Sequence, residues 1–145
     1  MAMLTEVQIK DIAKRAYYDV RNFDFDCRAN VEFFQKEELF DWPGWAEAAD
    51  VQSEYVTTVN LILDGGMPDA PQRHGLFVAN RIALGWKKGA VVDRPGRIHP
   101  WLMPFADLPE EMRVWLVERD SIFESSVRNQ VEKLFTYKQE GEDDG

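Results

Sequence analysis

Basic residues gather in one stretch of a chain that is acidic overall. The formal net charge is −9, yet residues 73–99 hold a single acid, Asp93, beside six of the chain's 17 lysines and arginines: Arg73, Arg81, Lys87, Lys88, Arg94 and Arg97. Both histidines, His74 and His99, lie in the same stretch. Arginine and lysine bind phosphate oxygens, and histidine donates or accepts a hydrogen bond near neutral pH. The pattern favours a site for a small anion. The alternative is that these cations pair with acids elsewhere on the surface.

Tryptophans accompany these cations. Four of them lie close to a proline or glycine, where an indole can frame a concave site for a planar ring: Trp42, Trp45, Trp86 and Trp101. The sequence therefore predicts a ligand site made of Trp45, His74, Trp86, Lys87, Lys88, Arg94, Arg97, His99 and Trp101. The alternative is that the tryptophans are ordinary core residues and that the histidines cap helix ends.

Catalytic and metal-binding patterns are weak in this sequence. Cys27 could in principle meet His74 or His99 as a nucleophile with a base, but a packed thiol on an apolar helix is the simpler interpretation. One cysteine and two histidines 25 residues apart do not have the spacing of a zinc site. We predict no catalytic residues, no metal and no cofactor.

The composition also limits the partners. A net charge of −9 disfavours a nucleic-acid polymer as ligand, because such ligands need a broad basic surface. An apolar run of about 18 residues, the length that spans a bilayer, does not occur. The N-terminal residues lack the pattern of a secretory signal, and a single cysteine fits a reducing compartment. We therefore expect a cytoplasmic protein.

Helical periodicity predicts the elements that must position the site. A capping box at Thr5 and Gln8 opens a helix over about 5–21. Asp26 is expected to cap a short helix that holds Val31 and Phe34. The break at 41–45 precedes a helix to about Leu63, ended by Gly65–Gly66, with Val51, Tyr55, Val59 and Ile62 as its buried stripe. A further helix over about 71–84 is expected to present Phe77 and Leu84 on one face.

The segment 86–105 is irregular. Asp93–Gly96 predicts a tight turn between two very short strands. Asp107 is the expected cap of a last helix that reaches about Tyr137, with its apolar stripe at Val114, Val117, Ile122, Val127, Val131 and Leu134. The fold class is thus mainly α, with a minimal β hairpin and an irregular Pro/Gly/Trp-rich insert before the last helix. We expect 138–145 to be a disordered acidic tail.

Several of these residues resemble the ryanodine-receptor repeat (RyR) domain, in its stand-alone bacterial or bacteriophage type. The resemblance lies in His74-Gly-Leu-Phe77, Gly85-Trp86-Lys-Lys-Gly89, His99-Pro100-Trp-Leu-Met-Pro104-Phe105, Leu108-Pro109 and Arg119-Asp120-Ser-Ile-Phe123, and it covers about residues 42–135. Phe77, Lys88 and Phe105 replace the family's usual Trp, Tyr and Tyr. The resemblance implies an RyR-like domain over 42–137, preceded by an N-terminal helical extension over 1–41.

The resemblance also implies a function. It predicts a non-enzymatic module that binds a small phosphorylated, nucleotide-like ligand in the cytoplasm. Such a module acts as a bacterial sensor, or as a viral sponge that sequesters an immune signalling nucleotide in the host cytoplasm. A single repeat with an extra apolar helix further predicts a homodimer. The alternative is a protein–protein interaction or structural module with no small ligand.

Overall fold

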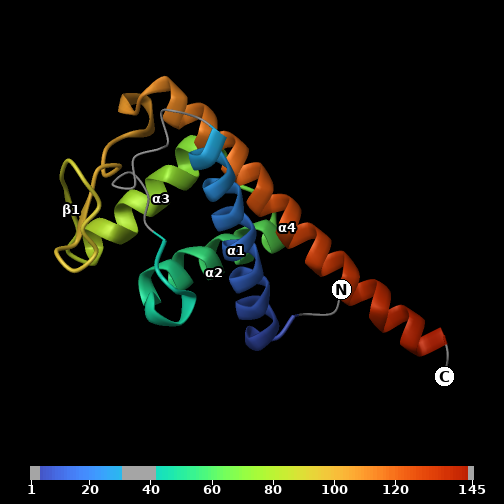
Figure 1. Cartoon of the computed structure of the whole chain (residues 1–145). Helices are drawn as coiled ribbons and strands as arrows, with labels where there is room; N and C mark the ends of the chain where they lie inside the picture. The colour runs from blue at the N-terminus through green and yellow to red at the C-terminus, as the bar shows by residue number, and fades with distance from the viewer. Residues whose placement is uncertain (1–3, 31–41, 144–145) are drawn as a thin grey trace.

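The structure is a computed structural model that describes residues 4–30 and 42–143 (Figure 1). Within these residues the elements are α1 (Glu6–Asn30), the short 3-10 helix η3 (Trp45–Glu47), α2 (Ala49–Asp64), α3 (Ala70–Ala83), β1 (Lys87–Lys88), β2 (Ile98–His99), the 3-10 helix η4 (Phe105–Asp107) and α4 (Glu110–Asp143). The prediction of a mainly helical protein is confirmed. Among the helices of the described ranges, none is both long and apolar enough to cross a membrane.

Helix α1 begins where the capping box predicts but ends much later. The Gln8 amide N–H donates to Thr5 Oγ1 at 3.1 Å, and the Thr5 N–H donates to Gln8 Oε1 at 2.8 Å. The predicted end near residue 21 is wrong, and Asp26 lies inside α1 rather than capping a second helix. The polar Asp24 looks like a break in the apolar stripe, but it is 1% exposed and pairs with Arg119. Val31 and Phe34 lie outside the described residues.

Helices α2 and α3 follow the predicted pattern closely. Val51, Tyr55, Val59 and Ile62 are all buried on α2, as expected, and Gly65 follows its last residue. Helix α3 begins with a capping box in which the Asp69 side chain accepts a hydrogen bond from the Gln72 N–H at 2.9 Å. The prediction for Leu84 is wrong: it lies just after α3 and is 42% exposed.

The buried face of α4 is one residue out of step with the predicted stripe. Val114 and Val117 are 54% and 52% exposed, whereas Trp115, Leu116 and Phe123 are buried. Two adjacent faces of this helix are apolar, and the bulkier aromatic residues take the interior because they remove more apolar area from water. Val127 is buried as predicted.

The two ends of α4 also differ from expectation. Asp107 is the last residue of η4 rather than the cap of α4, which begins at Glu110. At the other end, α4 continues through Asp143 and projects past the other helices (Figure 1), where the sequence predicts a disordered tail. Most residues of 138–143 have a high intrinsic helix propensity, so α4 continues through this segment.

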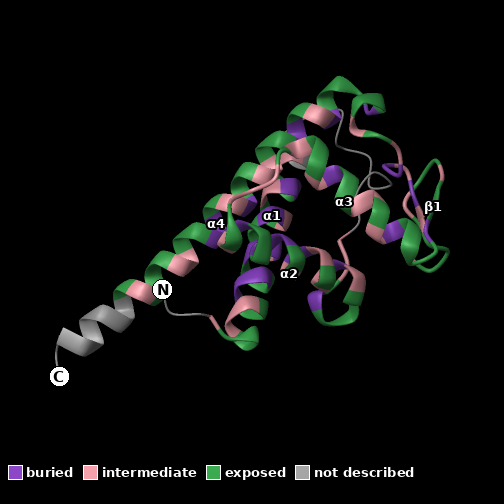
Figure 2. Ribbon diagram, turned by 180° about the vertical axis from the view of Figure 1, so that it is seen from behind, coloured by how far each residue is buried: buried purple, intermediate pink, exposed green. Residues whose placement is uncertain are grey.

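The helices enclose two apolar clusters. The larger one joins α1, α2 and α4, and Figure 2 shows the buried positions where these helices meet. It contains Tyr17 of α1, Trp45 of η3, Tyr55 of α2 and Phe123 of α4. The second cluster surrounds Trp115 and takes in Trp101, Leu108 and Met112. Helix α1 therefore shares one core with the helices of the 42–137 region.

The irregular segment contains a tight turn but no regular hairpin. The Arg97 N–H donates to the Arg94 carbonyl at 3.1 Å, and Asp93 and Ile98 form an isolated antiparallel bridge. Strands β1 and β2 pair in parallel, with Lys87 opposite Ile98, so the expected β hairpin is wrong in its pairing direction. Arg97 has a φ of 56°, an unusual value for a residue other than glycine, and its turn redirects the chain so that Ile98 lies beside Lys87.

Candidate functional site

A cavity of about 390 Å³ lies between α2 and α3 and is closed by residues of α1, α4 and the segment around His99 and Trp101. This volume falls within the range of small-molecule sites. Where the cavity meets solvent, its lining residues are short or flexible and exposed: Ser53, Thr57, Leu76 and Ala79. The cavity therefore opens between α2 and α3.

Aromatic rings line one part of this cavity. Phe77 lies at the centre of the group, with ring centroids 5.8 Å from His74, 5.2 Å from His99 and 6.5 Å from Trp101. The His99 and Trp101 rings meet edge to face at 4.8 Å. Such edge and tilted contacts hold aromatic rings in place, so the wall is preorganised and mostly apolar.

Both histidines are oriented by the backbone. His74 Nε2 lies 2.8 Å from the Met103 carbonyl, which only accepts, so this nitrogen is the donor. The Trp101 N–H donates to His99 Nδ1 at 3.1 Å. Burial lowers the pKa of His74, although its hydrogen bonds to the backbone oppose that shift. His74 is therefore neutral near pH 7 and acts as a hydrogen-bonding ring rather than a cation.

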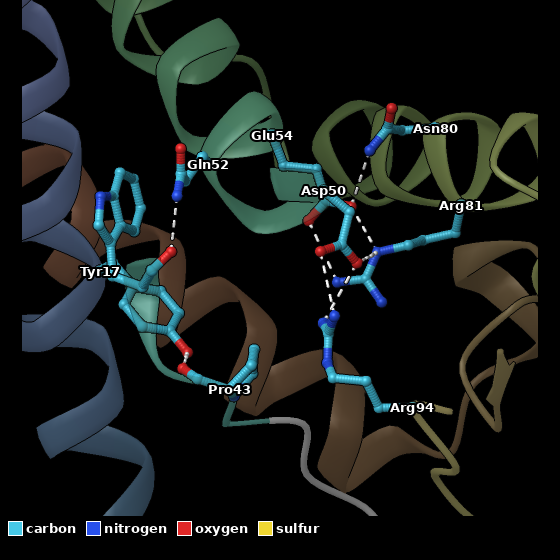
Figure 3. Close-up of polar contacts among 9 residues, drawn as sticks. Tyr17, Pro43, Asp50, Gln52, Glu54, Asn80, Arg81 and Arg94 are labelled. Carbon is cyan, nitrogen blue, oxygen red and sulfur yellow. Dashed lines mark hydrogen bonds and ion pairs between the residues drawn. The ribbon is translucent and has the colours of Figure 1, made fainter. Parts of the chain in front are cut away.

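Arg81 is a cation of the cavity wall that pairs with two carboxylates. It is 3% exposed, and its Nε donates to Glu54 Oε1 at 2.6 Å; Asn80 donates to the same oxygen at 2.9 Å. The Arg81 guanidinium also lies 4.6 Å from the centroid of Trp86. Its Nε is 3.5 Å from Asp50, which Figure 3 shows between Arg81 and Arg94. The charge of Arg81 is thus shared between two carboxylates.

Arg94 completes this arrangement from outside the cavity. Its two terminal nitrogens each donate to one oxygen of Asp50 at 3.1 Å (Figure 3). Its guanidinium lies 5.3 Å from the Trp86 centroid. Burial opposes the charge on Asp50, but the hydrogen bonds from Arg94 and the charge of Arg81 outweigh burial and lower the pKa of this carboxyl. Arg94 therefore anchors the turn to the start of α2.

Two more arginines line the cavity near Tyr55. Arg119 Nε contacts both oxygens of the buried Asp24 at 3.3 and 3.2 Å, and the Trp42 indole donates to Asp24 at 3.3 Å. Arg73 Nη1 is 3.5 Å from Asp120, and its guanidinium lies 5.6 Å from the Tyr55 centroid. Burial raises the pKa of the Tyr55 hydroxyl, while Arg119 and Arg73 oppose the shift.

The structure brings together part of the predicted site. His74, His99 and Trp101 line the cavity. Among the described lining residues, the other predicted members do not occur: Trp45, Trp86, Lys87, Lys88, Arg94 and Arg97. Trp45 packs in the larger core against Tyr17 and Tyr55. Lys87 and Lys88 are exposed on β1, and Arg97 donates to the Leu84 carbonyl at 2.9 Å.

Sequence reasoning missed the polar residues that do line the cavity, chiefly Tyr55, Arg73, Arg81 and Arg119. A usable signal existed for two of them. Arg73 and Arg81 are two helical turns apart and flank His74 and Phe77, so all four lie on one side of α3. The sequence predicts Tyr55 in the buried stripe of α2, where it lies, and its side chain also lines the cavity.

Among the described residues, no group of three or more His, Cys, Asp or Glu side chains is placed to hold a metal ion. No protein-family model matches the chain. No solved structure matches it either. The case for a function therefore depends on the cavity itself, and the resemblance to the RyR domain stays a prediction.

Proposed function

We propose that this protein is a non-enzymatic binding module for a small, planar, anionic ligand of the nucleotide type, held in the cavity between α2 and α3. The observation that carries the proposal is the cavity of about 390 Å³, which combines a wall of aromatic rings with arginine side chains. Phe77 and Trp101 supply faces and edges for a planar ring. Arg73, whose ion pair with Asp120 is 3.5 Å long, supplies positive charge close by.

The histidines suit recognition better than proton transfer. Both rings are hydrogen-bonded to the backbone, His74 to the Met103 carbonyl and His99 by the Trp101 N–H, which fixes their orientation. Cys27 is not among the described residues that line the cavity, and burial raises the pKa of its thiol, which disfavours the reactive thiolate. The histidines would therefore serve as fixed parts of the wall against which the ligand packs.

Capture of the ligand is sufficient for either biological role that the RyR-like motifs suggest. As a sensor, the protein would report the ligand through the packing of α2 against α3. As a sponge, it would lower the concentration of a signalling nucleotide by binding alone. Both roles require the ligand and the protein to share a cytoplasm, bacterial or host.

A thermal-shift panel tests the proposal. It contains adenine and guanine nucleotides, cyclic dinucleotides and ADP-ribose derivatives. Ligand at about 100 times its dissociation constant stabilises the folded state by about 2.7 kcal/mol, so at least one compound should raise the unfolding midpoint. A panel in which no compound shifts the midpoint would overturn the nucleotide proposal.

Blocking the opening of the cavity provides a matched pair of variants. Ala79→Trp fills the mouth from the exposed side of α3 and should abolish the shift that the best compound gives. Ala83→Trp adds the same side chain to the same helix at an exposed position that does not line the cavity, and it should keep the shift. Equal shifts in the two variants would place binding elsewhere.

A second candidate is an interaction module, and the exposed apolar residues of α4 favour it. Val114 and Val117 lie one turn apart and are each more than half exposed. We propose that such a surface supports the homodimer. Light scattering at high protein concentration should give twice the mass of one chain, and Val117→Glu should return the mass to that of one chain. A wild-type protein of single mass at all concentrations contradicts the dimer.

A further inference from the structure

The Tyr55 hydroxyl oxygen and Arg73 Nε are buried near the cavity and lack hydrogen-bond partners within the described residues. Tyr55 is 4% exposed, and both side chains line the cavity. A buried donor without a partner costs free energy, so native structures retain few of them without a reason. The Arg73 guanidinium lies 5.6 Å from the Tyr55 ring centroid, so the two donors occupy one region, contributed by α2 and α3.

The ion pair of Arg73 is also the longest among the three arginines of the cavity. Its Nη1 is 3.5 Å from Asp120, whereas a charge-assisted hydrogen bond is about 2.7–2.9 Å. Arg81 contacts Glu54 at 2.6 Å, and Arg119 contacts Asp24 at 3.2 Å. Arg73 is therefore the cation of this cavity whose charge is least satisfied by its carboxylate.

We propose that Arg73 and Tyr55 form the anion subsite of the cavity, and that Asp120 is displaced from Arg73 and takes up a proton when an anionic ligand arrives. This inference rests on the proposed function and specifies its ligand. A single available guanidinium suits one phosphate group. The subsite should therefore favour a nucleoside monophosphate or cyclic monophosphate over a triphosphate.

The proton uptake follows from the surroundings of Asp120. Arg73 faces it from α3, and Arg119 lies beside it on α4. Arg119 is already neutralised by Asp24 of α1, and Tyr55 of α2 is uncharged. Once the ligand takes Arg73, the half-buried Asp120 has no cation of its own. Burial already raises the pKa of Asp120, and Arg73 and Arg119 oppose the shift. Loss of Arg73 as a partner removes part of this opposition, so the Asp120 carboxylate takes up a proton.

Cyclic adenosine 3′,5′-monophosphate is a suitable probe because a phosphodiester keeps one negative charge between pH 6 and 8. Its affinity for the full-length protein, measured by calorimetry, should rise as the pH falls, by up to about tenfold per pH unit for one proton taken up. Asp120→Asn carries no charge and keeps the shape, so it should bind the probe more tightly at pH 8 and with a flat pH profile. Neutral adenosine should show little pH dependence in any variant.

Three further variants make the test specific. Arg73→Gln in the Asp120→Asn background replaces the ion pair by two amides, which preserves folding, and should lose at least tenfold in affinity for the cyclic nucleotide. Tyr55→Phe should weaken the cyclic nucleotide more than adenosine. Glu124→Gln on the same helix removes a charge that pairs with Arg128 away from the cavity, and it should behave as wild type.

The outcomes separate this inference from the proposed function. If the cyclic nucleotide binds but Asp120→Asn and the Arg73 variant leave its affinity and pH profile unchanged, the subsite is wrong while the proposed function stands. If no nucleotide binds, the shift of the unfolding midpoint by sulfate tests the anion subsite. A larger midpoint shift by sulfate in Asp120→Asn than in wild type, lost in the Arg73 double variant, supports an anion subsite without a nucleotide site. Equal sulfate shifts in all variants overturn it.

Discussion

At the scale of single residues, burial disfavours the charged forms of His74 and Asp50, and only Asp50 has partners that outweigh burial. Burial lowers the pKa of His74, so the ring stays neutral while its Nε2 donates to Met103. Burial opposes the charged form of Asp50 too. The hydrogen bonds from Arg94 and the charge of Arg81 nevertheless lower the pKa of this carboxyl and keep it ionised. A hydrogen-bonding ring and a firm anion therefore coexist close to the cavity.

The pKa of His74 predicts how stability depends on pH. The unfolded histidine takes up a proton near pH 6.5, whereas the folded one resists it. The contribution of the neutral His74 ring to the free energy of unfolding is therefore fully present above pH 6.5. It is lost as the pH falls below that value, by at most about 1.4 kcal/mol per pH unit for one group. Urea unfolding at pH 7.5 and 5.5 should show that the free energy of unfolding falls less in His74→Gln, whose amide keeps a donor, than in the wild-type protein. Equal losses in the two proteins contradict the assignment.

At the scale of elements, the irregular segment between α3 and α4 is held by few but specific contacts. Arg94 joins its turn to Asp50 at the start of α2, and Trp86 packs against the guanidinium groups of Arg81 and Arg94. The parallel pairing of β1 with β2 places His99 beside Lys88. The turn is thus anchored next to the segment that carries His99 and Trp101 into the cavity wall.

Removing the Arg94 contact should loosen this segment. Arg94→Ala leaves Asp50 with fewer donors, so the free energy of unfolding should fall by about 1–2 kcal/mol, a value typical of a partly buried charged hydrogen bond. Lys87→Ala, on exposed β1, should change it by less than about 0.5 kcal/mol. Chemical denaturation measures both, and equal effects would show that the Arg94 pair contributes nothing beyond surface charge.

At the scale of the whole molecule, α1 is part of the main core. Tyr17 packs edge to face on Tyr55 at 5.2 Å, and its hydroxyl donates to the Pro43 carbonyl at 2.6 Å. Asp24 of the same helix satisfies Arg119 of α4. The helix therefore supplies both apolar cover and charge balance to the region behind the cavity.

A shortened chain tests this role. A fragment of residues 42–143 would expose Tyr55 and Phe123 and leave Arg119 without its buried carboxylate. We expect this fragment to show no cooperative unfolding transition and no near-ultraviolet circular dichroism, because a lost core layer costs more than the marginal stability of a small domain. Cooperative unfolding of the fragment would show that 42–143 folds independently of α1.

The sequence by itself determined the elements with strong local signals. The capping box at Thr5 and the buried stripe of α2 depend on neighbours three or four residues apart, so the chain pattern predicts them correctly. Three of the residues predicted for a ligand site, His74, His99 and Trp101, line one cavity, and they lie close together in the basic and aromatic part of the sequence.

Only the tertiary structure decided where α1 ends, which face of α4 is buried and which cations reach the cavity. Asp24 continues a helix because Arg119, 95 residues away, neutralises it. Lys87 and Lys88 are near the histidines in sequence but point to solvent, whereas Arg119 is distant in sequence and lines the cavity. Local spacing carries no information on such long-range pairing, because burial and charge compensation depend on which helices pack together.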